Sequence, residues 1–251
     1  MCIRDRGRAD LRFVRESDRG GRWVPRRGAP AELRAPEPSW EIGFGDGRFR
    51  VQPTPFKHVG VFPEQAANWL WVADRGLRLA AERPRLLNLF GYTGAASVLA
   101  AQAGFAVTHV DASRASLDWA RINAVASGLG ERGLRLVHED ALGFARREVR
   151  RGSRYAGVLV DPPHYGRGPR GEKWRLEEGL APLIEACGRL LDERGFLVLS
   201  TYAVGYSPLA LVGLLDELEG GAVEAGELAL PEEASGRLLP SGFCARWSRG
   251  L

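Results

Sequence analysis

The motif Asp-Pro-Pro-His-Tyr at positions 161–165 directly follows an apolar run at positions 156–160. The run predicts a buried strand, so the motif places an acid, a stiff turn and an aromatic ring at the strand's carboxyl end, where open α/β sheets bind ligands. There a carboxylate and main-chain carbonyls can accept hydrogen bonds from an amino group while a ring stacks on a planar ligand. Packing within its own loop is the alternative role for the tyrosine. The candidate catalytic residues are Asp161, Pro162, Pro163 and Tyr165.

A glycine-bearing turn, Phe-Gly-Tyr-Thr-Gly at positions 90–94, lies between a predicted strand and a predicted helix. Gly91 and Gly94 allow the backbone to come close to a ligand that faces the amides of the helix. The third glycine of a dinucleotide-binding fingerprint is missing, which disfavours a pyrophosphate ligand. A tight strand-to-helix connection without any ligand is the alternative.

Three acidic residues follow three predicted strands in order. Asp111 lies about 20 residues past Gly91, the separation at which an acid accepts hydrogen bonds from ribose hydroxyls. Asp140 follows the next strand, where a carboxylate can accept from an adenine amino group, and Asp161 follows the one after. Each acid alone could cap a helix. Because three successive strand ends deliver a carboxylate to the same rim, we favour a nucleoside-binding site.

The strands that must position these residues alternate with helices, which implies βαβ units and a parallel sheet. A helix at 208–218 and apolar stretches at 222–230 and 242–247 add an antiparallel edge pair. We therefore predict an α/β fold with a Rossmann-like, doubly wound, seven-stranded sheet. Its parallel strands are expected at 86–90, 106–110, 134–137, 157–160 and 196–200, and its helices from 95, from 113, at 141–151 and at 176–191.

The chain before this sheet divides into two parts. Residues 1–38 are rich in Arg, Gly and Pro without a sustained period, which predicts a basic, poorly ordered arm, and residues 1–6 resemble a translated sequencing adapter. Residues 39–60 alternate apolar side chains around a Gly-Asp-Gly turn at 45–47, which predicts a small β-hairpin. The main domain is then expected at 61–251, beginning with a helix at 64–81.

Composition sets few limits on function. The 251 residues are 45% hydrophobic and 26% charged, as in an ordinary globular domain, and the net charge of +4 leans only weakly toward a polyanionic partner. No apolar run of about 18 residues and no signal series occurs, so we expect a cytoplasmic protein without membrane contact. Cys2, Cys187 and Cys244 fit no zinc spacing, so no metal is expected. The oligomeric state is not indicated.

From about residue 40 to residue 208 the chain resembles the class I methyltransferases, and within them the bacterial large-subunit (23S) ribosomal RNA methyltransferases. The most specific segments are Thr-Pro-Phe-Lys-His at 54–58, Gly-Val-Phe-Pro-Glu-Gln at 60–65, Leu-Asn-Leu-Phe-Gly-Tyr-Thr-Gly at 87–94, Val-Asp-Ala-Ser at 110–113 and Asp-Pro-Pro at 161–163. The resemblance implies S-adenosylmethionine as cofactor, with its methionine part on the turn after the first strand, its ribose on Asp111 and its adenine on Asp140. The implied cofactor-binding residues are Phe62, Gln65, Asn88, Phe90, Gly91, Thr93, Gly94, Asp111, Ala112, Ser113, Asp140, Ala141 and Asp161.

The available cysteines bear on which atom is methylated. Methylating carbon 5 of a pyrimidine requires a cysteine thiolate, which relatives carry after the fifth strand, whereas this chain has Ser-Thr-Tyr at 200–202. Cys187 lies on an apolar helix face and is expected in the core, and Cys244, late in an edge strand, is no better placed. A base nitrogen therefore fits better, and the partner implied is RNA, first of all ribosomal RNA.

The loop at 166–174 supports that choice, because it adds three cations, flexible glycines and Trp174 to the same rim. A mobile, solvated lid explains the loop almost as well, and His164 is expected to be solvated. Three further functions stay open: the same cofactor with a small-molecule or protein substrate, an oxidoreductase, and a non-catalytic RNA-binding relative. The incomplete glycine pattern disfavours the oxidoreductase, and the three acids disfavour the non-catalytic relative.

Overall fold

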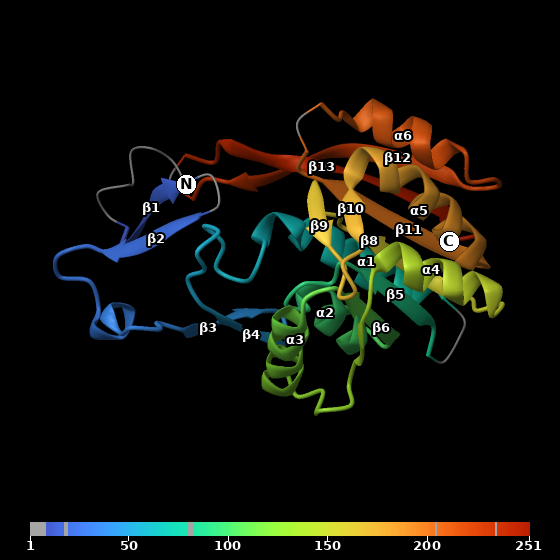
Figure 1. Ribbon diagram of the computed structural model, residues 1–251. Coiled ribbons are helices and arrows are strands. Elements are labelled where there is room, and N and C mark those ends of the chain that lie inside the picture. The colour runs from blue at the N-terminus through green and yellow to red at the C-terminus, as the bar shows by residue number, and fades with distance from the viewer. Residues whose placement is uncertain (1–8, 18–19, 80–82, 204, 234) are drawn as a thin grey trace.

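A mixed seven-stranded sheet forms the centre of the computed structural model, which describes residues 9–17, 20–79, 83–203, 205–233 and 235–251 (Figure 1). The strand order is β12-β13-β11-β8-β5-β6-β7, with parallel pairing from β11 to β7 and antiparallel pairing of β13 with both β11 and β12. The predicted Rossmann-like sheet with an antiparallel edge is therefore confirmed. Its strands are β5 (Arg85–Leu89), β6 (Ala106–Asp111), β7 (Arg135–His138), β8 (Tyr155–Val160), β11 (Leu191–Thr201), β12 (Ala222–Pro231) and β13 (Leu238–Arg249).

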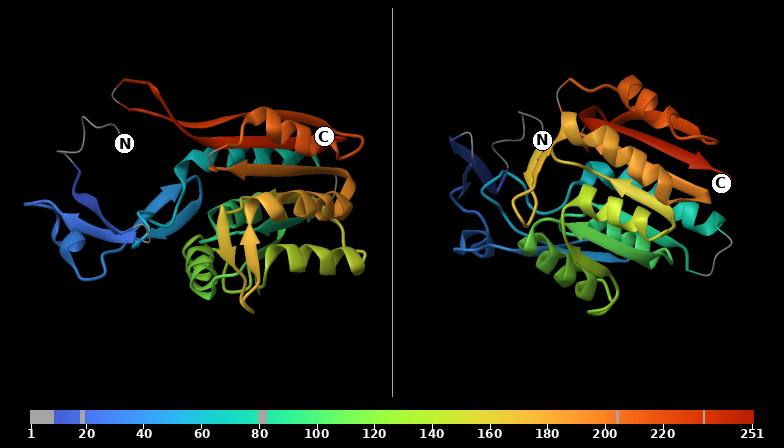
Figure 2. Two further views of the ribbon diagram at one scale, coloured as in Figure 1. Left: turned by 45° about the horizontal axis from the view of Figure 1, so that its top comes forward. Right: turned by 45° about the vertical axis from the view of Figure 1, so that its right-hand side comes forward.

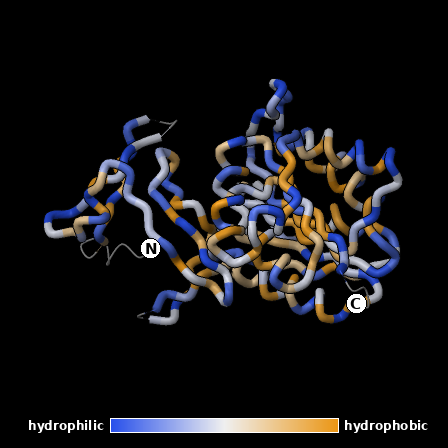
Figure 3. The backbone as a smooth tube through the Cα atoms, turned by 90° about the horizontal axis from the view of Figure 1, so that it is seen from below, coloured by the Kyte–Doolittle hydropathy of each residue, from blue (hydrophilic) through white to orange (hydrophobic). Residues whose placement is uncertain are grey.

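Helices cover both faces of the sheet, because successive strand residues point to opposite sides. Val158 packs in the cluster beneath α4, α5 and α6, whereas its neighbour Leu159 packs in the cluster beneath α1, α2 and α3. Figure 2 shows these helices on the two sides of the sheet, and Figure 3 shows that hydrophobic segments gather in this part of the molecule. The helices are α1 (Ala66–Arg78), α2 (Ala95–Gln102), α3 (Arg114–Ala126), α4 (Ala141–Arg150), α5 (Leu176–Leu190) and α6 (Pro208–Asp216).

Side-chain caps explain where three of these helices begin. Ser113, Asp140 and Ser207 each accept a hydrogen bond from a main-chain N–H in the first turn of α3, α4 and α6. Pro208 occupies the first position of α6, where its missing N–H is not needed. These starts lie at the predicted positions.

The predicted hairpin at 39–60 is present as β3 (Trp40–Phe44) and β4 (Gly47–Val51). Phe49 and Val51 are buried in the same cluster as α1 and α2. Asn123 of α3 accepts a hydrogen bond from the Arg50 N–H at 2.9 Å, and its amide nitrogen donates to the Thr93 carbonyl at 2.8 Å. The hairpin is thereby tied, through one buried side chain, to the turn that follows β5.

The arm expected at residues 1–38 needs a correction. Residues 11–17 and 20–25 pair as a second antiparallel unit, the β1–β2 hairpin of β1 (Leu11–Ser17) and β2 (Gly20–Pro25), which lies apart from the sheet in Figure 1. Phe13 and Trp23 pack edge to face at 5.5 Å across it, an alternation that the many arginines conceal in the sequence. The proposed adapter at 1–6 lies outside the described residues. None of the helices in the described ranges is long and apolar enough to span a membrane.

We predict that Asn123→Ala lowers the free energy of unfolding by about 1–3 kcal/mol, because it leaves the buried Thr93 carbonyl and the partly buried Arg50 N–H without partners. Urea unfolding with an unchanged m-value measures this loss. Ser127→Ala is the matched control, since Ser127 also bonds the hairpin, to Arg48, but at an exposed position. A loss for Asn123→Ala no larger than the control's would contradict the proposed link.

Candidate active site

A cavity of about 1070 Å³ opens at the carboxyl ends of β5, β6, β8 and β11. Gly94 is not among its lining residues, although the sequence placed it in the cofactor site. The predicted residues that do line the cavity are Phe62, Gln65, Asn88, Phe90, Gly91, Thr93, Asp111, Ala112, Ser113, Asp140, Ala141, Asp161, Pro162, Pro163 and Tyr165.

The turn between β5 and α2 has an unusual backbone. Phe90 and Tyr92 adopt positive φ angles of 56° and 52°, a region that residues with a Cβ rarely occupy. Main-chain bonds hold it there: the Gly91 N–H donates to the Val110 carbonyl at 3.0 Å, and the Tyr92 N–H donates to an Asp111 carboxylate oxygen at 2.8 Å. Such held strain is typical of functional sites.

The two glycines of this turn are required by packing within the protein. A Cβ on Gly91 would lie 2.3 Å from the buried imidazole of His109, and a Cβ on Gly94 would lie 2.9 Å from Ala120 of α3, at a φ of 87°. The hydroxyl of Thr93 donates to the Gly60 carbonyl. Packing within the protein therefore accounts for both glycines, and binding of the cofactor by Gly94 and Thr93 stays a prediction.

Asp111 and Asp140 combine a structural role with a place on the cavity. The second oxygen of Asp111 accepts from the Ser113 N–H at 2.8 Å, and burial raises the pKa of this carboxyl despite its two main-chain bonds. Asp140 caps α4 by accepting from the Gly143 N–H at 2.7 Å. Ser113 likewise caps α3. Capping and ligand binding are therefore compatible here, because each carboxylate oxygen has a second lone pair.

Asp161 directly follows β8 and lies among polar groups from other elements. The Ser200 hydroxyl donates to one of its oxygens at 3.0 Å, and the Gln65 amide donates to the other at 3.3 Å. Burial, together with the negative charge of Glu64, raises the pKa of Asp161 to about 6, against the two hydrogen bonds, which lower it. Asp161 can therefore gain and lose a proton close to neutral pH.

The segment after Asp161 differs from the expectation in two respects. Residues 165–175 form a short hairpin, β9 (Tyr165–Arg167) and β10 (Lys173–Arg175), where a flexible loop was expected. Trp174 is only 4% exposed, packs on Phe90 at 4.9 Å and donates its indole N–H to the Pro163 carbonyl at 2.7 Å. Trp174 is thus unavailable for a base, and the Pro163 carbonyl already has a donor. Tyr165, 50% exposed, keeps a free ring face.

Several lining residues were missed by the sequence reasoning. Phe62 lies 5.7 Å from Tyr92 and 6.1 Å from Tyr202 between ring centroids, so three aromatic rings border the cavity. Ser200 and Tyr202 stand at the carboxyl end of β11, beside β8. The strand-end rule that found Asp161 could have found these two residues.

Neither of the two cysteines in the described ranges supplies a nucleophile at this cavity. Cys187 is fully buried in the core, as predicted, and burial raises the pKa of its thiol. Cys244 lies opposite Ser200 in the β11–β13 ladder, closer to the site than expected, but it is buried, its pKa is also raised, and it does not line the cavity. The described residues contain no cluster of His, Cys, Asp and Glu that could hold a metal ion.

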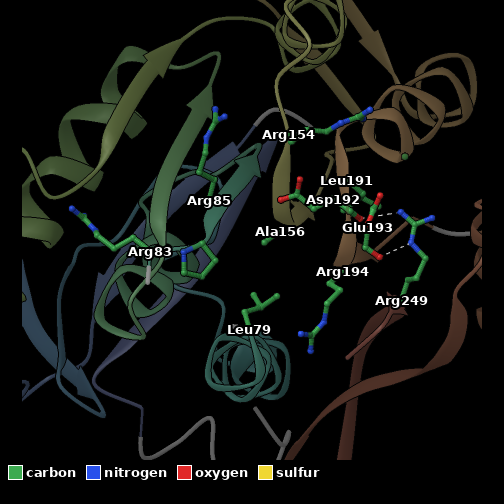
Figure 4. Close-up of a pocket in the computed structure, with 12 residues that line it drawn as sticks. Leu79, Arg83, Arg85, Arg154, Ala156, Leu191, Asp192, Glu193, Arg194 and Arg249 are labelled. Atoms are coloured by element: carbon green, nitrogen blue, oxygen red, sulfur yellow. Dashed lines mark hydrogen bonds between the residues drawn. The ribbon is translucent and has the colours of Figure 1, made fainter. Parts of the chain in front are cut away.

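A second cavity, of about 860 Å³, lies at the opposite, amino-terminal edge of β5 and β8 (Figure 4). Arg194 and Arg249 donate to main-chain carbonyls there, including those of Gly250 and Glu193, and so join β11 to the end of the chain. The other arginines of this cavity, Arg83, Arg85 and Arg154, point in different directions in Figure 4. This arrangement offers no convergent anion site.

Comparison with known proteins finds similar methyltransferases. No protein-family model matches the chain. A SAM-dependent methyltransferase from Agrobacterium tumefaciens is 38% identical, with a TM-score of 0.90 over 98% of this chain and 79% of that one. The ribosomal RNA large subunit methyltransferase K/L of Methylococcus capsulatus is 34% identical over 160 residues, which are 62% of this chain but 21% of that protein. The chain thus spans about a fifth of this curated relative.

A third match shows the fold alone. The magnesium protoporphyrin IX methyltransferase of Synechocystis, solved with bound SAM, has a TM-score of 0.52 at 17% identity, over 74% of this chain and 79% of that one.

We predict that Asp111→Ala weakens S-adenosylmethionine binding at least 10-fold, because it removes a charged acceptor from the cavity. Titration calorimetry measures the affinity. Unchanged affinity would show that the Asp111 carboxylate only accepts the hydrogen bonds of the main chain and does not contact the cofactor.

Asp140→Ser offers a matched comparison, because serine keeps the cap on α4 while withdrawing the carboxylate from the cavity. If Asp140 contacts the adenine, Asp140→Ser weakens binding severalfold while unfolding shifts by less than about 0.5 kcal/mol.

Proposed function

The chain belongs to the S-adenosylmethionine-dependent methyltransferases, and we propose that it methylates a base nitrogen of ribosomal RNA. The observation that carries the proposal is a cavity of about 1070 Å³ with the Asp161 carboxylate at its wall, where the motif Asp-Pro-Pro follows β8. An enzyme of this kind would act in the cytoplasm.

The residues of the cavity suit the cofactor. Its volume of about 1070 Å³ is at the upper end of the range for small-molecule sites. Asp111 has lone pairs left for ribose hydroxyls, and Asp140 has an oxygen left for the adenine amino group. The strained turn and Phe62 border the space beside them, where we place the methionine part.

The name of the Methylococcus relative supports a ribosomal RNA substrate, although that protein is about five times longer than the matched part. Cations on the cavity rim support it independently. Lys57 and Arg167 line the cavity, and neither forms an ion pair within the described part of the chain. Unpaired cations beside exposed rings such as Tyr165 suit phosphates and unstacked bases.

The β1–β2 hairpin is attached to the segment that leads to the cavity. Its Gly21 N–H donates to the Pro55 carbonyl at 2.9 Å, and the Trp23 indole donates to the Thr54 carbonyl at 2.8 Å. These bonds tie it to the segment that carries Lys57. Arg12 of the hairpin is exposed and forms no ion pair among the described residues, so the hairpin can bind RNA phosphates.

S-adenosylmethionine supplies a methyl group on a positively charged sulfur, and the carbon–sulfur electron pair stays with sulfur when the methyl group leaves. The chain's own residues must hold the accepting nitrogen in line and take up the proton that this nitrogen releases. Asp161 can accept that proton, since its pKa of about 6 leaves it ionised at neutral pH. The Pro162 carbonyl can accept a second hydrogen bond from an amino group, and Tyr165 can stack on the base.

The direct test is methyl transfer from labelled S-adenosylmethionine to unmodified ribosomal RNA. We expect label in the RNA with the wild-type protein and at least a 100-fold lower rate with Asp161→Ala, because the proton acceptor is lost. Transfer RNA and a protein extract are the parallel substrates. Label that enters protein or small molecules but no RNA would contradict the proposal.

The acid limb of kcat/KM should have a midpoint near pH 6, because Asp161 accepts the proton only when ionised. Removing the charge of Glu64 lowers the pKa of Asp161, so Glu64→Gln should move this midpoint to lower pH. A pH–rate profile of both proteins measures the shift. A midpoint that stays in place, or moves upward, would exclude Asp161 as the titrating group.

A further inference from the structure

A chain of hydrogen bonds leads from the edge strand β13 to the cavity. The Arg246 guanidinium donates to the Asn68 side-chain oxygen at 2.9 Å, and the Asn68 amide nitrogen donates to the Gln65 side-chain oxygen at 2.7 Å. A guanidinium has donors only, so it fixes which end of each amide is the acceptor. Gln65 therefore presents its NH₂ group to the cavity.

The two hydrogens of the Gln65 NH₂ group are shared among three oxygens there. The Gln65 nitrogen lies 2.7 Å from the Tyr202 hydroxyl, 2.9 Å from the Ser200 hydroxyl and 3.3 Å from Asp161. Since the nitrogen is the donor, the Tyr202 oxygen is an acceptor in this contact, and its own hydrogen is left over. No hydrogen bond donated by Tyr202 occurs within the described residues, and Tyr202 lines the cavity. The phenol can therefore donate to a ligand.

The phenol also keeps its proton. Burial raises the pKa of Tyr202 well above its usual range, and the charges of Asp161 and Glu64 and the nearby Cys244 raise it further. The Ser200 hydroxyl, in contrast, already donates its hydrogen to Asp161 and cannot donate it to a ligand. The cavity wall thus presents one donor, Tyr202, beside one acceptor, Asp161, both within hydrogen-bond distance of the same Gln65 nitrogen.

We propose that Tyr202 is a specificity-determining donor which, together with Asp161, recognises an amino group and the ring nitrogen next to it on a nucleobase. Arg246 is the positioning residue that sets the direction of the donor. This inference rests on the proposed function and narrows it. Adenine, cytosine and the amino edge of guanine each carry an amino donor beside a ring-nitrogen acceptor, whereas uracil has no amino group and the O6/N7 edge of guanine has acceptors only.

Tyr202→Phe tests the donor, because phenylalanine keeps the ring and loses the hydroxyl. With unmodified ribosomal RNA we expect kcat/KM to fall about 10-fold, and the Kd for S-adenosylmethionine, measured by calorimetry, to stay within twofold. An unchanged kcat/KM would overturn the proposal. A comparable loss of cofactor affinity would overturn it too, since Tyr202 would then serve the cofactor.

Arg246→Gln and Arg246→Lys test the positioning role. Glutamine can donate or accept and so releases the amides of Asn68 and Gln65, whereas lysine still only donates. We expect Arg246→Gln to lose about as much kcat/KM as Tyr202→Phe, Arg246→Lys to retain most of it, and the Tyr202→Phe, Arg246→Gln double variant to lose no more than either single one. Losses that multiply would overturn the coupling. Thermal melts identify any variant that fails to fold.

The methylated product separates this inference from the proposed function. After nuclease digestion, mass spectrometry should find the methyl group on an exocyclic amino nitrogen. Methylation of a ring nitrogen such as guanine N7 would uphold base-nitrogen methylation and overturn the inference. If S-adenosylmethionine binds but no RNA is methylated, the proposed function fails, and the inference fails with it.

Discussion

The strained turn between β5 and α2 is the constraint on which the rest of the site depends. Phe90 and Tyr92 hold left-handed backbone at a cost of about 1 kcal/mol or more each, so other elements must keep them there. Those elements are β6 through Asp111, α3 through Asn123, and the segment before η3 (Pro63–Gln65) through Gly60. Because Asn123 also binds the β3–β4 hairpin, the hairpin, the turn and Asp111 are positioned as one unit.

Asp161, like the strained turn, lowers the stability of the fold. Its pKa rises from 3.8 to about 6 on folding, so the folded chain binds a proton that the unfolded chain has released. The contribution of Asp161 to stability therefore falls as pH rises from about 4 to 6, and above this window the ionised group opposes folding. Ser200 and Gln65 lessen the penalty without removing it. A charge kept where it weakens the fold is typical of an active site.

Sequence reasoning succeeded where the physics is local. Strand periodicity and strand ends predicted the sheet and placed Asp111 and Asp161 on one cavity, because a strand's carboxyl end is readable from its own residues. It was less successful where a residue's environment depends on a partner that is distant in the sequence. Trp174 looked exposed because Phe90, which buries it, is far away in the sequence. For Gly94 the sequence could not distinguish a ligand contact from close packing on Ala120, because both require a missing Cβ.

The antiparallel edge of the sheet also depends on contacts between residues that are distant in the sequence, and these contacts orient groups at the cavity. Pairing of β13 with β11 puts Arg246 opposite Val198, and from there the guanidinium reaches Asn68 on α1. The hydrogen-bond chain then runs from a group that only donates to the Asp161 carboxylate, which only accepts when ionised. Reversing either amide between these ends would place two donors or two acceptors face to face. The strand that closes the sheet therefore also fixes the direction of the hydrogen bonds at the cavity.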